Sequence, residues 1–379
     1  KAVELFSASS DGLVGLIRGT AECHVTTMPG TVRHLDSELP LIALTSVTTG
    51  RIARKQGLAG RLAAEIVARG VDNGGLVAGL GMFEQGFYNR LGFGTASYEH
   101  SVSFDPATLT VTGRPAVPFG LSKDHWEAMH SNRLRRVACH GACSITTSSF
   151  TRADVEFTKD GFGLGYFDEA DGRLTHHFFG RAKGETGPYS IYWLAYENHG
   201  QLLELLRVIK SLGDQVRTVR MEEPPGVHLQ DFLSQPFRFR QLTEKGESEH
   251  KMTSTAYSQL RICDVPGCLE RTSIPNCEPI RFNLELIDPI EALLDDRAGF
   301  RGVAGDYIVQ IGEESYARAG QESGLPLLTA SVGAFTRLWM GVLPATGLAL
   351  TEELNAPEDL LIRLDRNLRL PTPHFDWMY

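Results

Sequence analysis

LIALTSVTTGRIARKQGLAG, residues 41–60, decides the fold of this chain. Its first seven residues form an aliphatic and β-branched run of strand length that stops at a Thr-Thr-Gly turn. From Leu58 onward the apolar residues recur at helical spacing, and Gly70 is placed to close the helix. The stretch therefore predicts a strand, a basic glycine-containing loop and an amphipathic helix.

The predicted loop has the composition of an anion site. Arg54 and Lys55 precede Gly57, and helix-forming sequence begins directly afterwards. A helix that starts at such a turn directs free backbone N–H groups and its positive dipole end toward the loop, which suits a pyrophosphate. The loop lacks the Gly-Lys-Ser/Thr ending of a Walker A loop and the three-glycine spacing of a Rossmann turn. The plainer interpretation is a solvated loop before a surface helix.

The pattern Arg54-x-x-Gly57-x-Ala59 resembles the acetyl-coenzyme A (acetyl-CoA) loop of the GNAT N-acetyltransferases, whose consensus is Gln/Arg-x-x-Gly-x-Gly/Ala. Residues 75–82 then predict a second strand, and the segment GFYNRLGFG follows at residues 86–94. GNAT proteins carry a segment close to Phe-Tyr-x-Arg-x-Gly-Phe at this place, with a tyrosine near the departing sulfur. The alternative for these aromatics is an ordinary place in the core, but the order and spacing of the elements agree with the family.

Composition narrows the functional class. The chain has 379 residues, of which 42% are hydrophobic and 22% charged, and this length and composition fit two or three globular domains. Its formal net charge of -9 argues against a general nucleic-acid binder. An acidic balance is compatible with a cationic amine substrate. No apolar run approaches the ~20 residues that a membrane span needs, and no signal peptide is recognised. We therefore expect a cytoplasmic protein without a membrane partner.

The six cysteines offer two spacings that invite a metal interpretation. They are Cys139-His140-x-x-Cys143 and Cys263-x4-Cys268. Neither has the paired Cys-x2-Cys spacing of a structural zinc site, and six cysteines in a cytosolic chain of this size are most often free thiols. We expect no metal.

The region before the central strand is short for a GNAT domain. Residues 11–22 predict a strand, and residues 30–40 predict a polar connection. A first strand and one or two helices should come earlier, and the chain opens at Lys1. The N-terminus is therefore expected to be incomplete. Residues 106–118, rich in proline and glycine, have a linker composition.

A second unit repeats the layout of the first without its chemistry. A hairpin within 161–179, a strand at 191–196, a helix at 201–212 and a strand at 215–221 follow in order. The turn before that helix reads Glu-Asn-His-Gly at 197–200. A coenzyme pyrophosphate would meet a carboxylate there, so we interpret this unit as a degenerate copy. His176 and His177 are adjacent in a strand, which predicts one core and one surface histidine.

The composition changes again near Thr253, where a third unit is expected to begin. It opens at residues 260–265 and includes strands near 280–287 and 306–311 and helices at 332–343 and 358–368. The chain ends PTPHFDWMY, residues 371–379. Terminal tails are usually polar and disordered. A tail with this many aromatics should be buried.

Two GNAT-like units followed by an α+β unit with an apolar C-terminus resemble the enhanced intracellular survival (Eis) acetyltransferases. The resemblance implies an α+β fold: a catalytic GNAT domain (1–114), a degenerate GNAT-like domain (115–252) and a sterol-carrier-protein-like domain (253–379) whose tail enters the active site. It implies acetylation of amines, including aminoglycosides, by acetyl-CoA. It also implies a homo-oligomer, often a hexamer.

The resemblance assigns roles residue by residue. It implies that Tyr88 is the general acid and that the terminal carboxylate, on Tyr379, is the general base. Phe83 and Glu84 would run along the pantetheine, with Phe83 replacing a small polar residue of some members. The strand end and the loop would hold the rest of the coenzyme through Val47, Thr48, Thr49, Arg54, Lys55, Gln56, Gly57, Leu58, Ala59 and Gly60.

The chemistry gives each role a reason. An amine must be neutral to attack a thioester, so a base has to remove a proton, and the departing thiolate gains from a proton donor. Backbone N–H groups at the strand end would steady the oxyanion. The rival class is a coenzyme-sensing or lipid-carrying protein in which the first unit is a relic. Intact Arg54, Gly57 and Tyr88 favour the enzyme.

Overall fold

The computed structural model describes residues 10–84, 86–234, 251–351 and 353–379. Packing groups the chain into two compact units. Unit A comprises Ser7–Ser97, Cys139–Thr146 and Ala256–Tyr379, and unit B includes Tyr98–Ala138 and Thr147–Thr255. The regions predicted as first and third domains thus pack together in unit A, and the division into three domains stays a prediction.

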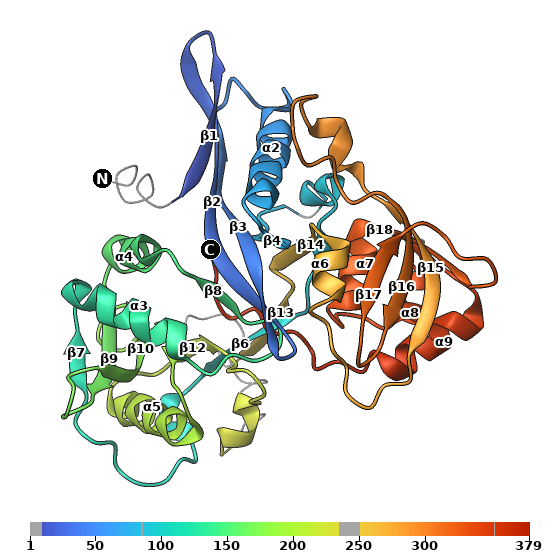
Figure 1. Ribbon diagram of the computed structural model, residues 1–379. Coiled ribbons are helices and arrows are strands. Elements are labelled where there is room, and N and C mark those ends of the chain that lie inside the picture. The colour runs from blue at the N-terminus through green and yellow to red at the C-terminus, as the bar shows by residue number, and fades with distance from the viewer. Residues whose placement is uncertain (1–9, 85, 235–250, 352) are drawn as a thin grey trace. The chain divides into compact units, whose positions relative to one another are not determined.

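The first sheet of unit A is mixed, with the strand order β1-β2-β3-β4-β14-β5 and β8 paired to β2 (Figure 1). β3 and β4 run parallel, and the other neighbours run antiparallel. β14 comes from the region predicted to open the third domain. The strands are β1 Asp11–Ile17, β2 Thr20–His34, β3 Ser37–Thr49, β4 Val77–Gly81, β5 Gly94–Thr95, β8 Cys143–Ile145 and β14 Ser258–Ile262.

The beginning of this sheet differs from the prediction. Residues 11–22 form most of a hairpin rather than one strand, because Arg18 and Gly19 adopt left-handed φ values of 51° and 83° and turn the chain back. The expected polar connection at 30–40 is also wrong, since β2 and β3 pair antiparallel through it. Val32, His34 and Leu39 are buried there and carry the alternating pattern of strands.

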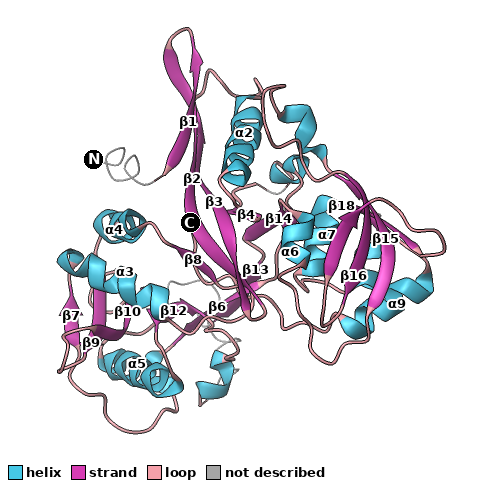
Figure 2. Ribbon diagram, viewed as in Figure 1, coloured by secondary structure: helices cyan, strands magenta, loops and turns pink. Residues whose placement is uncertain are grey.

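Helix α2, Leu58–Asp72, connects β3 to the parallel strand β4 and packs on β1, β2 and β3 (Figure 2). Its buried face consists of Ala63, Ala64, Ile66, Val67 and Ala68. The helix runs past Gly70, so the prediction that this glycine closes it is wrong. Gly70 instead admits the Ile42 side chain, because an added Cβ would lie 2.7 Å from two of its carbons.

The second sheet of unit A has the order β17-β16-β15-β18-β19. Its strands are β15 Ile280–Ile287, β16 Gly305–Ile311, β17 Tyr316–Ala319, β18 Leu327–Ser331 and β19 Leu354–Asn355. The accompanying helices are α6 Val265–Leu269, η6 Pro289–Leu293, α7 Val332–Trp339, α8 Ala345–Ala349 and α9 Glu358–Asn367. The short helix η1, Tyr88–Leu91, lies beside the first sheet. The predicted strands and helices of this region are confirmed, although α7 ends early, at a turn where Gly341 has a φ of 67°.

Unit B holds one mixed sheet in the order β13-β6-β12-β11-β10-β9-β7. The predicted hairpin is β9 with β10, and the predicted helix joins the parallel strands β11 and β12. The elements are β6 Glu99–Phe104, β7 Phe119–Leu121, β9 Gly161–Phe167, β10 Leu174–Ala182, β11 Tyr189–Ala195, β12 Val219–Glu222, β13 Lys251–Thr255, α3 Trp126–Arg135, α4 Ser148–Phe157 and α5 His199–Ser211, with the short helices η2 Pro106–Thr108, η3 Lys123–His125, η4 Leu212–Asp214 and η5 Leu229–Phe232.

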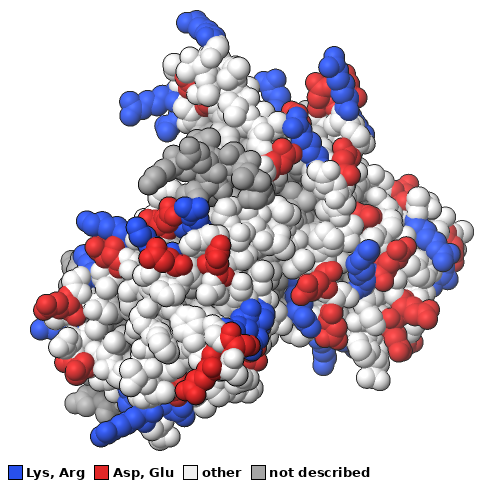
Figure 3. Space-filling view, turned by 60° about the vertical axis from the view of Figure 1, so that its left-hand side comes forward, with Lys and Arg blue, Asp and Glu red and all other residues white. Residues whose placement is uncertain are grey.

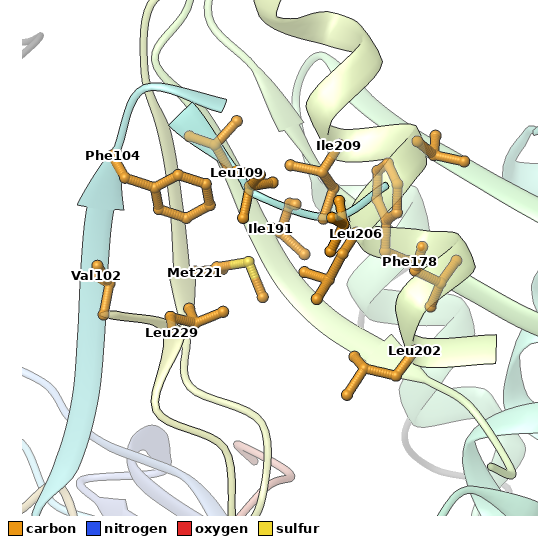
Figure 4. Packing of buried hydrophobic residues seen from close by; sticks show 14 of the residues in the cluster. Val102, Phe104, Leu109, Phe178, Ile191, Leu202, Leu206, Ile209, Met221 and Leu229 are labelled. Carbon is orange, nitrogen blue, oxygen red and sulfur yellow. The ribbon is translucent and has the colours of Figure 1, made fainter. Parts of the chain in front are cut away.

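One buried apolar cluster of unit B lies between the sheet and α5, and another involves Met129 of α3 and Val155 of α4. Leu206 and Ile209 of α5 meet Phe104, Phe178 and Met221 of the strands in one apolar cluster (Figure 4). Because one face of α5 is buried in this cluster, its apolar residues recur at helical spacing, and this spacing predicts α5 from the sequence.

The histidine pair of unit B is more buried than expected. His177 is inaccessible to solvent, and His176 is 9% exposed with its ring stacked on Tyr166 at a centroid distance of 4.6 Å. The prediction of one surface histidine is therefore wrong. The Tyr166 ring covers His176, and strand alternation alone does not reveal such a neighbour.

Acidic and basic side chains are interspersed over the face shown in Figure 3. No helix within the described ranges has the length and apolarity to cross a membrane. No group of three or more His, Cys, Asp or Glu side chains in that same part of the chain could hold a metal ion.

Candidate active site

Strands β3 and β4 diverge where the sequence predicts the acetyl group to sit. Their parallel pairing runs from Leu41 with Val77 to Leu44 with Leu80. β3 then continues to Thr49, paired on its other side with β2 and carrying a bulge at which Ser46 takes a φ of 53°. A bulge re-aims a strand and interrupts its ladder. The residues from Thr45 to Thr49 therefore leave one backbone edge without a strand partner within the described residues.

The predicted anion loop joins this strand end to α2. Ala53 is 1% exposed and anchors the loop, while the amide of Gly50 donates to the Glu22 carbonyl oxygen at 2.6 Å. Lys55 and Gly57 take left-handed φ values of 62° and 75°, and Gly57 is the N-cap residue of α2. Glycine adopts that conformation without strain.

The start of α2 carries the features of an anion-binding helix end. It has no side-chain cap and no acidic residue in its first turn. Arg54, Lys55, Gln56 and Gly57 are exposed, and neither cation forms an ion pair within the described part of the chain. Free amide groups, the helix dipole and two full positive charges therefore face solvent at one place. Leu58, Ala59 and Gly60 are half-buried in the first turn.

Tyr88 begins η1 and lies in an aromatic cluster. Its side chain is 2% exposed, and the rings of Phe83, Phe87 and Phe93 meet it edge-on at centroid distances of 5.9, 4.9 and 6.2 Å. Burial, with a smaller effect of the Tyr257 phenol, raises the pKa of Tyr88 to about 12. The phenol is therefore fully protonated at neutral pH.

Tyr257 was not predicted from the sequence as part of the site. This residue precedes β14, and its carbonyl oxygen accepts from the amide of Met82 at 2.8 Å. Its ring lies over Gly81, where an added Cβ would be 3.0 Å from the hydroxyl oxygen and closer still to the ring. Tyr257 also acts electrostatically on Tyr88. The phenol of Tyr257, from a distant part of the chain, thus lies at the end of β4 and near enough to Tyr88 to influence its pKa.

The C-terminal tail is held along unit A. The His374 amide donates to the His140 carbonyl oxygen at 2.8 Å, and the Cys143 amide donates to Asp376 Oδ1 at 3.2 Å. Phe375 and Trp377 are 3% and 2% exposed. The prediction of a buried aromatic tail is confirmed for these two residues, whereas Met378 is 48% exposed.

The last residue reaches the central strand. A Cβ at Gly79 of β4 would collide with the hydroxyl oxygen of Tyr379. Gly79 and Gly81 share one face of β4 because they are two residues apart, so the rings of Tyr379 and Tyr257 lie against the same side of that strand. The glycine alternation of GLVAGLGM was the sequence signal for two close approaches.

The structure thus places three predicted groups around β4. The strand end with Val47, Thr48 and Thr49 leads into the loop that starts α2, Tyr88 follows β4, and the Tyr379 ring contacts it. Phe83 is 69% exposed and Glu84 is exposed, so neither is committed to a buried structural role. The assignment of individual roles to these residues stays a prediction.

The architecture is similar to that of solved N-acyltransferases. A conserved protein from Enterococcus faecalis V583 described as a probable N-acyltransferase superposes with a TM-score of 0.77 at 18% identity, covering 99% of this chain and 91% of that chain. Eis1 from Mycobacterium abscessus gives 0.76 at 14%, covering 100% and 92%. A GCN5-related N-acetyltransferase from Anabaena variabilis ATCC 29413 gives 0.74 at 13%, covering 97% and 89%. The chain has the GNAT fold.

Neither a protein-family model nor a curated protein matches the sequence. The predicted α+β class with GNAT-type mixed sheets is confirmed by the GNAT fold of these structures. At such identities the likeness establishes the fold alone. The loop, the diverging strands and the buried phenol are the features of this chain that bear on its activity.

Proposed function

We propose that the chain is an N-acetyltransferase that moves an acetyl group from acetyl-CoA directly to a primary amine. One observation carries the proposal: the uncapped start of α2, with Arg54 and Lys55 exposed beside it, follows a strand that diverges from its parallel neighbour. This arrangement offers a diphosphate site continuous with an unpaired strand edge. A long ligand with a phosphate at one end and amides along its length fits both.

The strand edge suits the acetyl and pantetheine end of the coenzyme. Residues Thr45 to Thr49 present backbone donors and acceptors that β4 does not use. The pantetheine amides would pair with them as an added strand does. A backbone N–H there would also stabilise the oxyanion that forms when the amine attacks the thioester carbonyl.

The reaction requires two proton movements. The acceptor ammonium loses a proton, its nitrogen attacks the carbonyl carbon, and a C–N bond forms as the C–S bond breaks. Tyr88 donates a hydrogen bond and then its proton to the departing sulfur, because its high pKa keeps the phenol protonated until then. The α-carboxylate of Tyr379 takes the proton from the amine. In water this group is a weak base, and desolvation around a bound acceptor would raise its pKa.

The acceptor is proposed to be a cationic small molecule with a primary amine. The net charge of -9 favours its approach. The aromatic rings of Phe83, Tyr257 and Tyr379 provide faces that attract a cation and pack on its carbon skeleton. Aminoglycosides and other polyamines meet this description.

The acid assignment is tested by Tyr88→Phe. We expect kcat to fall about 100-fold, a typical contribution of a positioned proton donor, with the Kd for acetyl-CoA unchanged because the ring remains. Free-thiol release from acetyl-CoA with a panel of amines measures the rate. Tyr192→Phe, which removes a half-exposed phenol from β11 of unit B, is the matched control. Wild-type turnover in Tyr88→Phe would exclude this role, and coenzyme binding without thiol release for any amine would indicate a sensor instead.

The base assignment is tested by adding two residues after Tyr379. The extension moves the terminal carboxylate and leaves every side chain in the sequence. We expect at least a 100-fold loss of kcat at neutral pH, since general bases contribute about 10²–10⁴. Recovery at alkaline pH, where the amine is neutral without assistance, supports a lost base. Full activity of the extended chain at neutral pH contradicts the assignment.

A further inference from the structure

β14 presents one face to the segment that carries Tyr88. Tyr257, Gln259 and Arg261 are two residues apart and so share a face of the extended chain. Gln259 and Arg261 donate hydrogen bonds to η1, at Asn89 and at the Leu91 carbonyl oxygen, and Tyr257 acts electrostatically on Tyr88. β14 is separated from η1 by about 170 positions in the sequence. Its partner strands are β4 and β5.

Gln259 grips the segment at its centre. The side chain is fully buried, and Nε2 donates to Asn89 Oδ1 at 3.1 Å and to Thr95 Oγ1 at 3.2 Å. The same Asn89 oxygen accepts from the amide of Gly86 at 3.2 Å. One amide group of β14 therefore fixes the turn that leads into Tyr88 together with the residue that follows Tyr88.

The position of Gln259 is not explained by stability. Its Oε1 is buried without a hydrogen-bond partner within the described residues. A buried acceptor left unpaired costs about 1–3 kcal/mol. An apolar residue of similar shape would avoid that cost and would still fill the space. The side chain is better explained by the two hydrogen bonds that it donates.

Arg261 fixes the far end of the segment. Its guanidinium donates to the Leu91 carbonyl oxygen and to Asp288, with Nη2 2.6 Å from Oδ2. Both charged groups are buried, at 0% and 1% side-chain exposure. The carboxylate also accepts from the amides of Ile290 at 3.1 Å and Val303 at 2.8 Å. Buried ion pairs add little net stability, but a pair held by so many bonds defines a position.

We propose that β14 is the positioning element of the active site and that Gln259 is the positioning residue for Tyr88. This inference rests on the proposed function. Hydrogen bonding to a departing sulfur requires the phenol to stay within about 0.5 Å of its working position. η1 is too short to be rigid by itself, so the bonds from Gln259 and Arg261 supply the rigidity that the aromatic contacts of Tyr88 lack.

A double-mutant cycle between Gln259 and Tyr88 tests the proposal. Gln259→Leu keeps the shape of the side chain and removes its donors. We expect it to lower kcat about tenfold in the otherwise unchanged enzyme, a part of the 10²–10⁴ that a proton donor contributes, and less than about twofold in the Tyr88→Phe background. KM for acetyl-CoA should stay constant. Gln310→Leu on β16, whose Nε2 donates to the Glu314 carbonyl oxygen at 2.8 Å, is the matched control.

A second variant guards against misfolding. Asn89→Leu removes the other end of the same hydrogen bond and should lower kcat by a similar factor, and combining it with Gln259→Leu should add little further loss. Thermal unfolding identifies any variant that fails to fold.

The outcomes separate the two hypotheses. Equal losses in both Tyr88 backgrounds, or no loss in either, overturn the positioning role alone. Wild-type activity of Tyr88→Phe overturns the acid assignment, and the absence of acetyl transfer in the unchanged protein overturns the proposed function.

Discussion

Two crossover helices in the described residues have the same topology and opposite chemistry at their starts. α2 joins the parallel strands β3 and β4, and α5 joins the parallel strands β11 and β12. α2 begins at the left-handed Gly57 with no side-chain cap. The N-cap residue of α5 is Asn198, whose side-chain oxygen accepts from the Gln201 amide at 3.1 Å. One helix start is left open to a ligand, and the other is closed by the protein itself.

Charge strengthens the contrast. Beside α2 stand Arg54 and Lys55, exposed and without an ion pair in the described portion of unit A. Before α5 stands Glu197, whose carboxylate lies 3.1 Å from Arg135 and whose amide donates to Gln201 Oε1 at 2.6 Å. The two units thus share a strand-helix-strand crossover, whereas the residues before the two helices differ in charge and capping. Function in such a fold is decided by the few residues between strand and helix.

The largest expected effect comes from reversing the charges beside α2. Arg54→Glu with Lys55→Glu should raise the Kd for acetyl-CoA about 100-fold, because attraction of the pyrophosphate becomes repulsion at two positions. Calorimetric titration at two salt concentrations measures it, and the effect should shrink as salt rises. Arg114→Glu with Lys159→Glu makes the same charge change on exposed positions of unit B and should leave Kd unchanged. An unchanged Kd in the Arg54→Glu, Lys55→Glu variant would contradict the proposed difference between the starts of α2 and α5.

Acid should affect both units alike, although we propose a ligand site at only one of the two turns. Burial lowers the pKa of His34 in unit A and of His177 in unit B to about 3. His34 stacks on Trp339 at 4.3 Å, and His177 is held between Asn132 at 2.7 Å and Trp193 at 2.9 Å. Each is neutral when folded, so below the unfolded value of about 6.5 the unfolded state binds a proton that the native state refuses.

Stability is therefore full above pH 6.5 and falls as the pH drops toward about 3, where the folded histidines titrate. At pH 5 each histidine should cost about 2 kcal/mol of unfolding free energy relative to pH 7. Urea unfolding at both values, with probes for each unit, measures the loss. His34→Phe, which keeps a ring on Trp339, should reduce the loss in unit A and leave that of unit B unchanged, while burial still lowers the pKa of the neighbouring His140. An unchanged pH dependence of unit A in that variant would contradict the assignment.

The turns were predictable from sequence because their signals are local. The strand period before residue 48, the helical period after Leu58 and the cations between them are adjacent, and so is the Glu-Asn pair before α5. The β2–β3 pairing through residues 30–40 was missed because half-buried polar residues hide the alternation of Val32 and His34. The exposed residues of a strand give no information about the buried residues with which the strand pairs.

The surroundings of Tyr88 were not predictable, and the reason is distance along the chain. Gln259 and Arg261 lie in a short strand whose sequence does not indicate which sheet it joins. The same holds for Tyr257, whose contact with Gly81 joins positions more than 170 residues apart. The tail was foreseen as buried from its aromatic content, but its hydrogen bonds to His140 and Cys143 depend on a loop that only the folded chain brings there.

The smallest expected effect comes from opening the second turn. Asn198→Ala removes the side-chain cap of α5 and should lower the unfolding free energy by about 1 kcal/mol, the usual value of such a cap. The Kd for acetyl-CoA should not change, because Glu197 still repels a phosphate at that helix start. Urea unfolding and calorimetric titration give the two quantities. Gln215→Ala, an exposed position of the same unit, controls for loss of a polar side chain.

The outcome of Asn198→Ala decides what the cap is for. A loss of stability with unchanged coenzyme affinity means that the second crossover has a purely structural role. The start of α5 then contributes to stability only through its own hydrogen bonds. Weaker acetyl-CoA binding in this variant would show that unit B still holds part of the coenzyme, and the contrast between the two turns would no longer separate a ligand site from a structural copy.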